Sequence, residues 1–277
     1  MTASVEIPYC GPAPQPGHLV WNADPLLAVV LLVGAAAYGF SVRKTLLSRR
    51  VQFYFWAGWT VGALALVSPL CNLGVALFSA RAAQHVLLTT LAAPLLVLGG
   101  IGGMAGNWTE PRRALRPGAR REGFTLALAA LVFAAVMWGW HLPALYDATF
   151  HSTAVYWAMH ATMLSSAVLL WSATLQRCGQ RLFWSLSTIL ATMLQMSLLG
   201  ALITFAAKPL YVVHSSTTWP WGLSPLEDQQ LGGLLMWVIG GVLVMAWAVL
   251  VFAQYLLREV SPALPLSGSF SSAQLSR

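Results

Sequence analysis

Charged side chains are scarce in this sequence. Asp, Glu, Lys and Arg make up 8% of its 277 residues, whereas a soluble domain carries about 25%. Hydrophobic residues make up 58%. They form long continuous runs and not the alternating stretches of about ten residues that are typical of a transmembrane β-barrel. We therefore expect an all-α, polytopic membrane protein whose helices form one bundle.

Motifs of the common enzyme classes are also missing. The sequence contains no Walker loop, no GxGxxG at a strand-to-helix turn, no HExxH and no GxSxG, so we predict that the protein is not an enzyme. Its three cysteines, Cys10, Cys71 and Cys178, lack CxxC or Cys/His finger spacing. This predicts neither a zinc module nor a disulfide framework. The N-terminus lacks the basic and apolar segments of a signal peptide.

Seven apolar stretches are long enough to cross about 30 Å of hydrocarbon. All but Arg81 and Lys208 of the 15 basic residues lie in the connections on one side of these stretches or in the C-terminal tail. Basic loops are typical of the cytoplasmic side, so the N-terminus is predicted outside and the C-terminus inside a bacterial inner membrane. The charge of +7 is then a topology signal that attracts membrane lipid, not nucleic acid. The predicted spans are residues 25–42, 51–69, 79–103, 123–141, 154–174, 182–206 and 230–256.

This topology predicts three parts. Residues 1–24 form a periplasmic N-terminal arm, residues 25–256 the seven-helix transmembrane domain, and residues 257–277 a disordered cytoplasmic tail. All six histidines then lie on the outer side or in the outer half of the membrane, so polar chemistry is expected at the outer face. These histidines are His18, His85, His141, His151, His160 and His214.

Three of these histidines come from three consecutive spans at similar depth. His85, His141 and His160 can meet if the spans are neighbours, and imidazole is a common ligand of copper, zinc, iron and nickel. Met163 shares a helix face with His160, and a thioether beside imidazole favours Cu(I). The alternative is that each histidine hydrogen-bonds to backbone near a helix end. The sequence thus predicts a metal site made of His85, His141, His160 and Met163.

A second polar group lies at the start of the third span. Arg81, Gln84 and His85 are spaced i, i+3 and i+4, so they share one helix face. Arg81 is expected either to reach lipid phosphates, to sit by a bound anion, or to form an ion pair with Asp147 or Asp228. Asp147 follows Pro143, which fits a turn where the fourth span ends, and is also a candidate partner for a histidine N–H.

Asp228 has a structural alternative. Ser224 and Glu227 form a capping box before the last span. Asp228 then lies in the first helical turn, where an acidic side chain complements the helix dipole.

Several of these segments resemble the CtaG-like cytochrome c oxidase assembly factors. The resemblance runs from about residue 68 to residue 237. It implies a seven-helix membrane protein that assembles a haem–copper oxidase at its periplasmic side, with copper delivery as the suggested role, and it implies oxidase subunits or other assembly proteins as partners. It also points to His85, His141, His160 and Asp228. Its most specific parts are Gln84-His85, Trp140-His141-x-Pro143-x-x-Tyr146-Asp147, and Asp228-Gln229 followed by Gly232-Gly233.

The sequence departs from the family pattern at three positions. Arg81 and Ala82 stand where the pattern has His and Met, and Met159 stands where it has Glu. These changes remove candidate ligands and add a positive charge. They favour an alternative in which the protein is an accessory subunit of an oxidase without a metal. A second alternative is a b-type haem protein that uses two of the histidines as axial ligands.

Overall fold

The computed structural model describes residues 8–45, 47–101, 119–175 and 182–260, and all of their regular structure is helical. Six helices are long and apolar enough to cross a membrane, or seven if the bent pair α2 and α3 is one span. The expectation of an all-helical fold with several candidate membrane spans is thereby confirmed in the described residues. Residues 261–277 of the predicted tail and the basic connections 102–118 and 176–181 lie outside the described residues.

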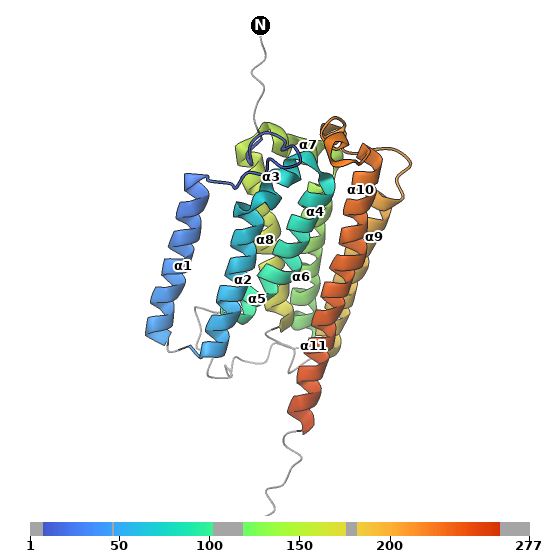
Figure 1. The fold of residues 1–277 in the computed structure, drawn as a ribbon. Helices are drawn as coiled ribbons and strands as arrows, with labels where there is room; N and C mark the ends of the chain where they lie inside the picture. The colour runs from blue at the N-terminus through green and yellow to red at the C-terminus, as the bar shows by residue number, and fades with distance from the viewer. Residues whose placement is uncertain (1–7, 46, 102–118, 176–181, 261–277) are drawn as a thin grey trace, which may run out of the picture.

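The helices stand side by side in one bundle (Figure 1). In chain order they are Pro25–Thr45 (α1), Arg49–Val67 (α2), Pro69–Ala76 (α3), Phe78–Val86 (α4), the π-helix Leu87–Ala92 (η1), Ala93–Leu98 (α5), Ala119–Trp140 (α6), Pro143–His151 (α7), Thr153–Leu175 (α8), Leu182–Thr204 (α9), the short 3₁₀ turns Val212–His214 (η2) and Trp219–Trp221 (η3), Pro225–Leu234 (α10), the π-helix Leu235–Gly240 (η4) and Gly241–Val260 (α11).

The second predicted span, residues 51–69, ends two residues earlier than expected, because a new helix begins at Pro69. α2 stops at Val67, and α3 follows at an angle of 46°. Ser68 causes the break: its backbone is extended, and its side chain accepts a hydrogen bond from the N–H of Leu70. Pro69 occupies the first position of α3, where a missing N–H costs nothing. α3 therefore leaves the direction of α2 and crosses the end of the bundle (Figure 1).

Pro143 begins a helix and does not simply end one. The expected exit turn is replaced by α7, nine residues long, with Pro143 at its first turn. A proline at this position lacks only an N–H that would have no helical partner. α7 lies at the same end of the bundle as α3 (Figure 1). The end of the bundle that carries α3, α7 and residues 8–24 is called the arm end below.

The span from α4 to α5 is central and contains a π-helical segment. Pro94 has no N–H, so the carbonyls one turn earlier lose a donor within the helix. Two tryptophans from neighbouring helices replace it: Trp171 Nε1 donates to the carbonyl of Thr89, and Trp247 Nε1 to that of Thr90, both at 2.8 Å. Irregular helix in a membrane is stable where neighbours satisfy its backbone in this way. The tryptophans therefore fix α8 and α11 to the central span.

Glycines allow α9 and α10 to approach closely. A Cβ atom added to Gly200 would lie 2.7 Å from the carbonyl oxygen of Gly233, and one added to Gly233 would lie 2.7 Å from that of Gly200. Small residues let membrane helices pack backbone against backbone. This contact holds the last span against the bundle and positions Asp228 over the start of α4.

Candidate functional site: a buried histidine cluster at the arm end

The structure brings three histidines together from three helices. His85 of α4 lies between His141, at the end of α6, and His160 of α8. Its ring centroid is 5.7 Å from that of His141 and 5.5 Å from that of His160. Each histidine is at most 5% exposed. These three residues are called the histidine cluster.

Several ring nitrogens in the cluster have no hydrogen-bond partner. Nδ1 of His160 lies 3.1 Å from the carbonyl of Tyr156, and Nδ1 of His141 lies 2.7 Å from that of Met137. A ring nitrogen that faces a carbonyl must carry the hydrogen, so Nε2 of each ring carries a lone pair in the neutral tautomer. Both nitrogens of His85 and Nε2 of His160 are buried without a partner. Buried polar atoms are normally satisfied, so these nitrogens are the atoms of the cluster that are available to a water molecule or a ligand.

The spacing suits an ion held between two rings. An imidazole nitrogen binds a transition metal at about 2 Å, so two rings that share an ion have centroids about 5 to 6.5 Å apart. Both pairs that include His85 fall in this range. In the described part of the chain, however, no three His, Cys, Asp or Glu side chains form a group that could enclose a metal ion. The cluster therefore offers paired imidazoles and not a closed site.

Met163 is buried on α8 within the hydrophobic core. Gln84 is also buried, and its Nε2 donates to the carbonyl of Ala65 at 2.7 Å. This bond ties the central span to α2. Gln84 thus has a structural role beside the cluster.

Arg81 is 2% exposed and reaches neither lipid nor an acidic side chain. Its Nη1 donates to the hydroxyl of Thr149 at 2.7 Å. Its guanidinium carbon lies 4.1 Å from the ring centroid of Phe150 and 5.2 Å from that of Tyr146. Aromatic faces stabilise a desolvated cation by about 2 kcal/mol. Cation–π contacts, and not an expected ion pair, thus accompany this buried charge.

Asp228 is fully buried and caps α4. Its carboxylate accepts hydrogen bonds from the N–H of Phe78 at 2.6 Å, the N–H of Ser79 at 3.2 Å and the hydroxyl of Ser79 at 2.5 Å. Free N–H groups and the helix dipole favour a negative charge at this place. The predicted capping box of Ser224 and Glu227 is present as well. Asp228 therefore fixes the start of the helix that carries Arg81 and His85.

Asp147 lies at the surface and has neither of the roles that were expected for it. Its carboxylate is 3.4 Å from Nε2 of His151, one turn further along α7, and both side chains are more than half exposed. No other ion pair is found in the described ranges. Asp147 thus neither pairs with Arg81 nor orients a ring of the histidine cluster.

A second buried polar group at the arm end was not expected from the sequence. The hydroxyl of Tyr146 lies 2.7 Å from Nε2 of His214, and the hydroxyl of Tyr211 donates to the carbonyl of His141 at 3.0 Å. Burial lowers the pKa of His214 to about 3, with the charge of Arg81 as a further cause. His214 is therefore neutral. Its place in a long loop gave no periodic signal of burial.

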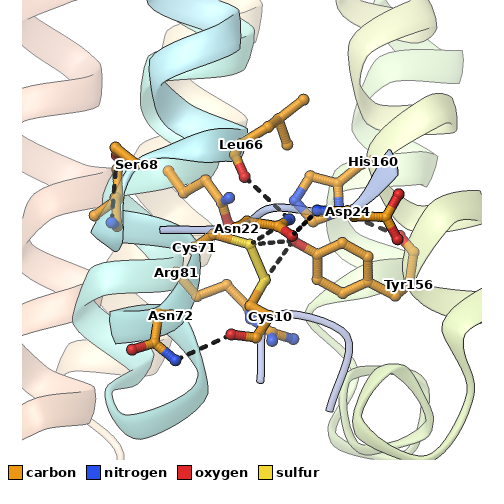
Figure 2. The surroundings of a disulfide bond; sticks show 12 residues. Cys10, Asn22, Asp24, Leu66, Ser68, Cys71, Asn72, Arg81, Tyr156 and His160 are labelled. Carbon is orange, nitrogen blue, oxygen red and sulfur yellow. Dashed lines mark hydrogen bonds between the residues drawn. A yellow bond between two sulfur atoms is a disulfide. The ribbon is translucent and has the colours of Figure 1, made fainter. Parts of the chain in front are cut away.

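A disulfide between Cys10 and Cys71 links residues 8–24 to α3 at the arm end (Figure 2). The prediction of no disulfide is wrong, because the fold brings together two cysteines that are 61 residues apart in sequence. The hydroxyl of Tyr156 lies 3.2 Å from the sulfur of Cys10 and 3.4 Å from that of Cys71. The ring of Tyr156 packs on His160, with centroids 4.3 Å apart. The disulfide thus fastens the arm next to the histidine cluster.

Hydrogen bonds hold the arm along the same face. Asn72 Nδ2 donates to the carbonyls of Cys10 and Pro12, each at 3.0 Å, and the N–H of Asn22 donates to the carbonyl of Val67 at 2.9 Å. Figure 2 shows Asn22, Asn72 and Arg81 around the disulfide. Residues 8–24 therefore form a fixed cover and not a loose extension.

Comparison with known proteins gives a family. The family model for the cytochrome c oxidase caa3 assembly factor (Caa3_CtaG) matches residues 25–258, which include all of the histidine cluster. No curated protein and no solved structure matches the chain. The match spans the whole helical bundle, and the chain therefore belongs to the cytochrome c oxidase caa3 assembly factor family.

Proposed function

We propose that this protein carries copper at the arm end and delivers it to a haem–copper oxidase during assembly. The family connects the chain to the oxidase or its assembly machinery. The observation that carries the copper role is the convergence of His85, His141 and His160, with buried nitrogens that have no partner. Neutral imidazole is a good ligand for copper ions.

We place the arm end on the periplasmic side of a bacterial inner membrane. Two observations support this. Arg43, Lys44, Arg49 and Arg50 all lie at the opposite end, where α1 ends and α2 begins, and basic residues favour the cytoplasmic side. A disulfide at the arm end also fits an oxidising compartment.

The cluster is suited to weak, transferable binding. His85 is the shared member of two pairs, so an ion held by His85 and His160 can be passed to His85 and His141 without leaving the cluster. Arg81 lies one turn from His85 on the same helix, and its positive charge opposes a cation there. The lack of a third ligand and the nearby charge both lower the affinity. A delivery protein requires such release, whereas a structural site does not.

Copper binding is tested with the purified protein in detergent. We expect bound Cu(I), measured by elemental analysis after titration under reducing conditions, to fall at least tenfold in His85→Ala. His151→Ala is the matched control, since His151 is exposed and outside the cluster. Equal copper in the wild-type protein and His85→Ala would contradict the proposal.

Arg81→Gln provides a second test with the opposite sign. The substitution keeps an unbranched polar side chain, removes the charge and adds no sulfur ligand, so the Cu(I) affinity should rise about tenfold. An unchanged or lower affinity would show that the charge of Arg81 does not act on the metal.

Arg81 also favours the alternative of an accessory subunit, because a buried arginine beside the histidine cluster disfavours the binding of any cation there. Stable co-purification with an assembled oxidase at a fixed ratio, without copper in the protein, would support this alternative. A Soret band in the visible spectrum of the purified protein would instead support the b-type haem alternative.

A further inference from the structure

A polar cavity of about 400 Å³ lies at the arm end, between the arm and the junction of α7 and α8. It is called the arm cavity here. Its wall consists of Tyr9 and residues 149–154, and most of these side chains carry a hydroxyl group. The side chain of His151 in this wall is 62% exposed, so the cavity reaches the surface. A polar cavity of this size has room for water and small solutes.

Two aromatic rings separate the arm cavity from the histidine cluster. The ring centroid of Tyr9 lies 4.6 Å from that of Tyr156, which in turn lies 4.3 Å from that of His160. Tyr156 is 3% exposed and His160 is 5% exposed. A solute in the arm cavity therefore reaches His160 by this route only if Tyr9 and Tyr156 move.

The first of these rings belongs to an arm that has few buried side chains of its own. Among residues 8–24, only Cys10 and Pro14 are buried. Hydrogen bonds to α2 and α3 hold the backbone of the arm. The stabilisation from a disulfide grows with the length of the loop that it closes, and this disulfide joins residues 61 positions apart. The covalent bond from Cys10 to Cys71 is thus the strongest single restraint on the neighbouring Tyr9.

The same disulfide restrains the second ring. The hydroxyl of Tyr156 contacts both sulfur atoms, and Figure 2 shows these contacts beside His160. If Cys10 left with the arm, Tyr156 would lose one sulfur at its hydroxyl and the ring of Tyr9 that packs on it. Tyr156 could then change its rotamer. One covalent bond therefore holds both rings over His160.

We propose that residues 8–24 are a redox-controlled lid over the histidine cluster. The lid is closed while Cys10 and Cys71 form the disulfide, and reduction by a dithiol lets the arm leave and opens the cluster to solutes from the arm cavity. This inference goes beyond the copper role, because the lid controls the access of any small solute and does not depend on what the histidines bind.

The opening step is a thiol–disulfide exchange with the dithiol reductant. A thiolate of the reductant attacks the sulfur of Cys10, which is 7% exposed against 1% for Cys71, and the bond between the two cysteines breaks. Cys71 leaves as a thiolate beside Nδ2 of Asn22, 3.6 Å from its sulfur, and takes up the proton that the attacking thiol released. The second thiol of the reductant then displaces Cys10 from the mixed disulfide. The products are two cysteine thiols and the oxidised disulfide of the reductant.

Modification of histidines by diethyl pyrocarbonate measures the opening without any metal. The full-length protein in detergent is modified before and after reduction by dithiothreitol, and mass spectrometry quantifies each histidine peptide. We expect the modification rate of His160, relative to that of the exposed His151, to rise about tenfold or more on reduction. His214 is 1% exposed and lies outside the lid, so it should stay unmodified unless the whole protein unfolds.

Cysteine variants separate the disulfide from other effects of the reductant. Cys10→Ser and Cys71→Ser should show the fast rate at His160 without dithiothreitol, and dithiothreitol should not raise it further. Cys178→Ser is the matched control, because the disulfide joins the other two cysteines. Its rate should be slow before reduction and fast after it, as in the wild-type protein.

A second pair of variants tests the ring of the arm while the disulfide stays intact. Tyr9→Ala removes the ring between the arm cavity and Tyr156, and should raise the rate at His160 about threefold in the oxidised protein. Trp21→Ala changes another aromatic residue of the arm, which is 58% exposed, and should leave the rate unchanged. Equal rates in these two variants would contradict the route through Tyr9.

Equal rates at His160 in the oxidised and the fully reduced protein would overturn the proposal, and so would a slow rate in Cys10→Ser. Modification of His214 together with His160 would overturn it as well, since the disulfide would then stabilise the whole fold and not the lid. A fast rate at His160 after reduction, in a protein that binds no copper, would support the lid and contradict copper delivery. The two proposals can therefore fail separately.

Discussion

The central span and α1 are both apolar helices of about twenty residues, yet their surroundings differ. Over an 18-residue stretch of the central span, Phe78–Leu98, 72% of the residues are buried inside the protein, whereas over an equal stretch of α1 the share is 11%. The central span carries Arg81, Gln84 and His85: Arg81 donates to Thr149, Gln84 donates to Ala65, and His85 belongs to the histidine cluster. α1 exposes Leu32 and Val33 to lipid. Polar residues thus occur in the central span, which is surrounded by other helices, and not in the exposed face of α1.

Asp228→Ala should have the largest effect on the central span. It leaves the N–H groups of Phe78 and Ser79 buried without an acceptor, so we expect a loss of about 3 kcal/mol in the free energy of unfolding. Unfolding by denaturing detergent measures this. Asp228→Asn keeps one acceptor oxygen and should lose less. Equal losses in both variants would show that the number of accepted hydrogen bonds is not the cause.

Trp171→Phe should cause the second-largest loss of stability. It removes the donor to the carbonyl of Thr89 in the π-helical segment, and a buried carbonyl without a partner costs about 2 kcal/mol. The unfolding midpoint in detergent should fall accordingly. Trp184→Phe removes an N–H from an exposed tryptophan and should change the midpoint little. A large drop in this control would mean that loss of ring area, and not of the donor, causes both decreases.

Acid should destabilise the arm end through His214. Its pKa is about 3 in the folded protein and about 6.5 in the unfolded chain, so below pH 6.5 the unfolded state binds more protons. Its contribution to stability is complete above pH 6.5 and falls by up to about 1.4 kcal/mol per pH unit on acidification towards the folded pKa. Unfolding midpoints at pH 6.5 and 4.5 measure this loss.

His214→Gln should show a smaller decrease in midpoint between these two pH values than the wild-type protein. His151→Gln is the matched control, because His151 is exposed on α7. If His214→Gln and the wild-type protein lose stability equally, His214 is not the group that responds.

Leu32→Ala in α1 should have the smallest effect. Leu32 is 69% exposed, so the change alters contact with lipid and not packing, and we expect a change within about 0.5 kcal/mol. The midpoint in lipid nanodiscs measures it. A loss above about 1 kcal/mol would show that α1 is covered by a partner or by a second copy of the chain.

The sequence predicted the helical class and most of the spans, because continuous apolar runs have one stable form in lipid. It also predicted that the three histidines lie at one depth, and the capping box before α10. It did not predict α7, since Pro143 fits the end of one helix and the start of another equally well. Nor did it predict the π-helix, which depends on tryptophans more than 75 residues away from Thr89 and Thr90.

The partners of the charged residues were also beyond the sequence. From the sequence, Asp147 and Asp228 were equal candidates for an ion pair with Arg81. In the structure, Arg81 instead donates to Thr149 and packs on the rings of Tyr146 and Phe150. The spacing of residues within a helix is the same whichever aspartate lies near Arg81, so it cannot predict the partner. Only the directions in which α7 and α10 cross α4 decide which side chains meet.

Composition and the run lengths of apolar residues alone determined that this chain is a helical membrane protein, because burying a charge or an unpaired backbone group in lipid is too costly for other folds. The identity of the cluster residues was likewise predictable from the sequence. The tertiary structure alone decided that His85 lies between His141 and His160, that Asp228 caps α4, and that Cys10 bonds to Cys71. These contacts join residues 56 to 150 positions apart in sequence, and only helix packing determines such distances.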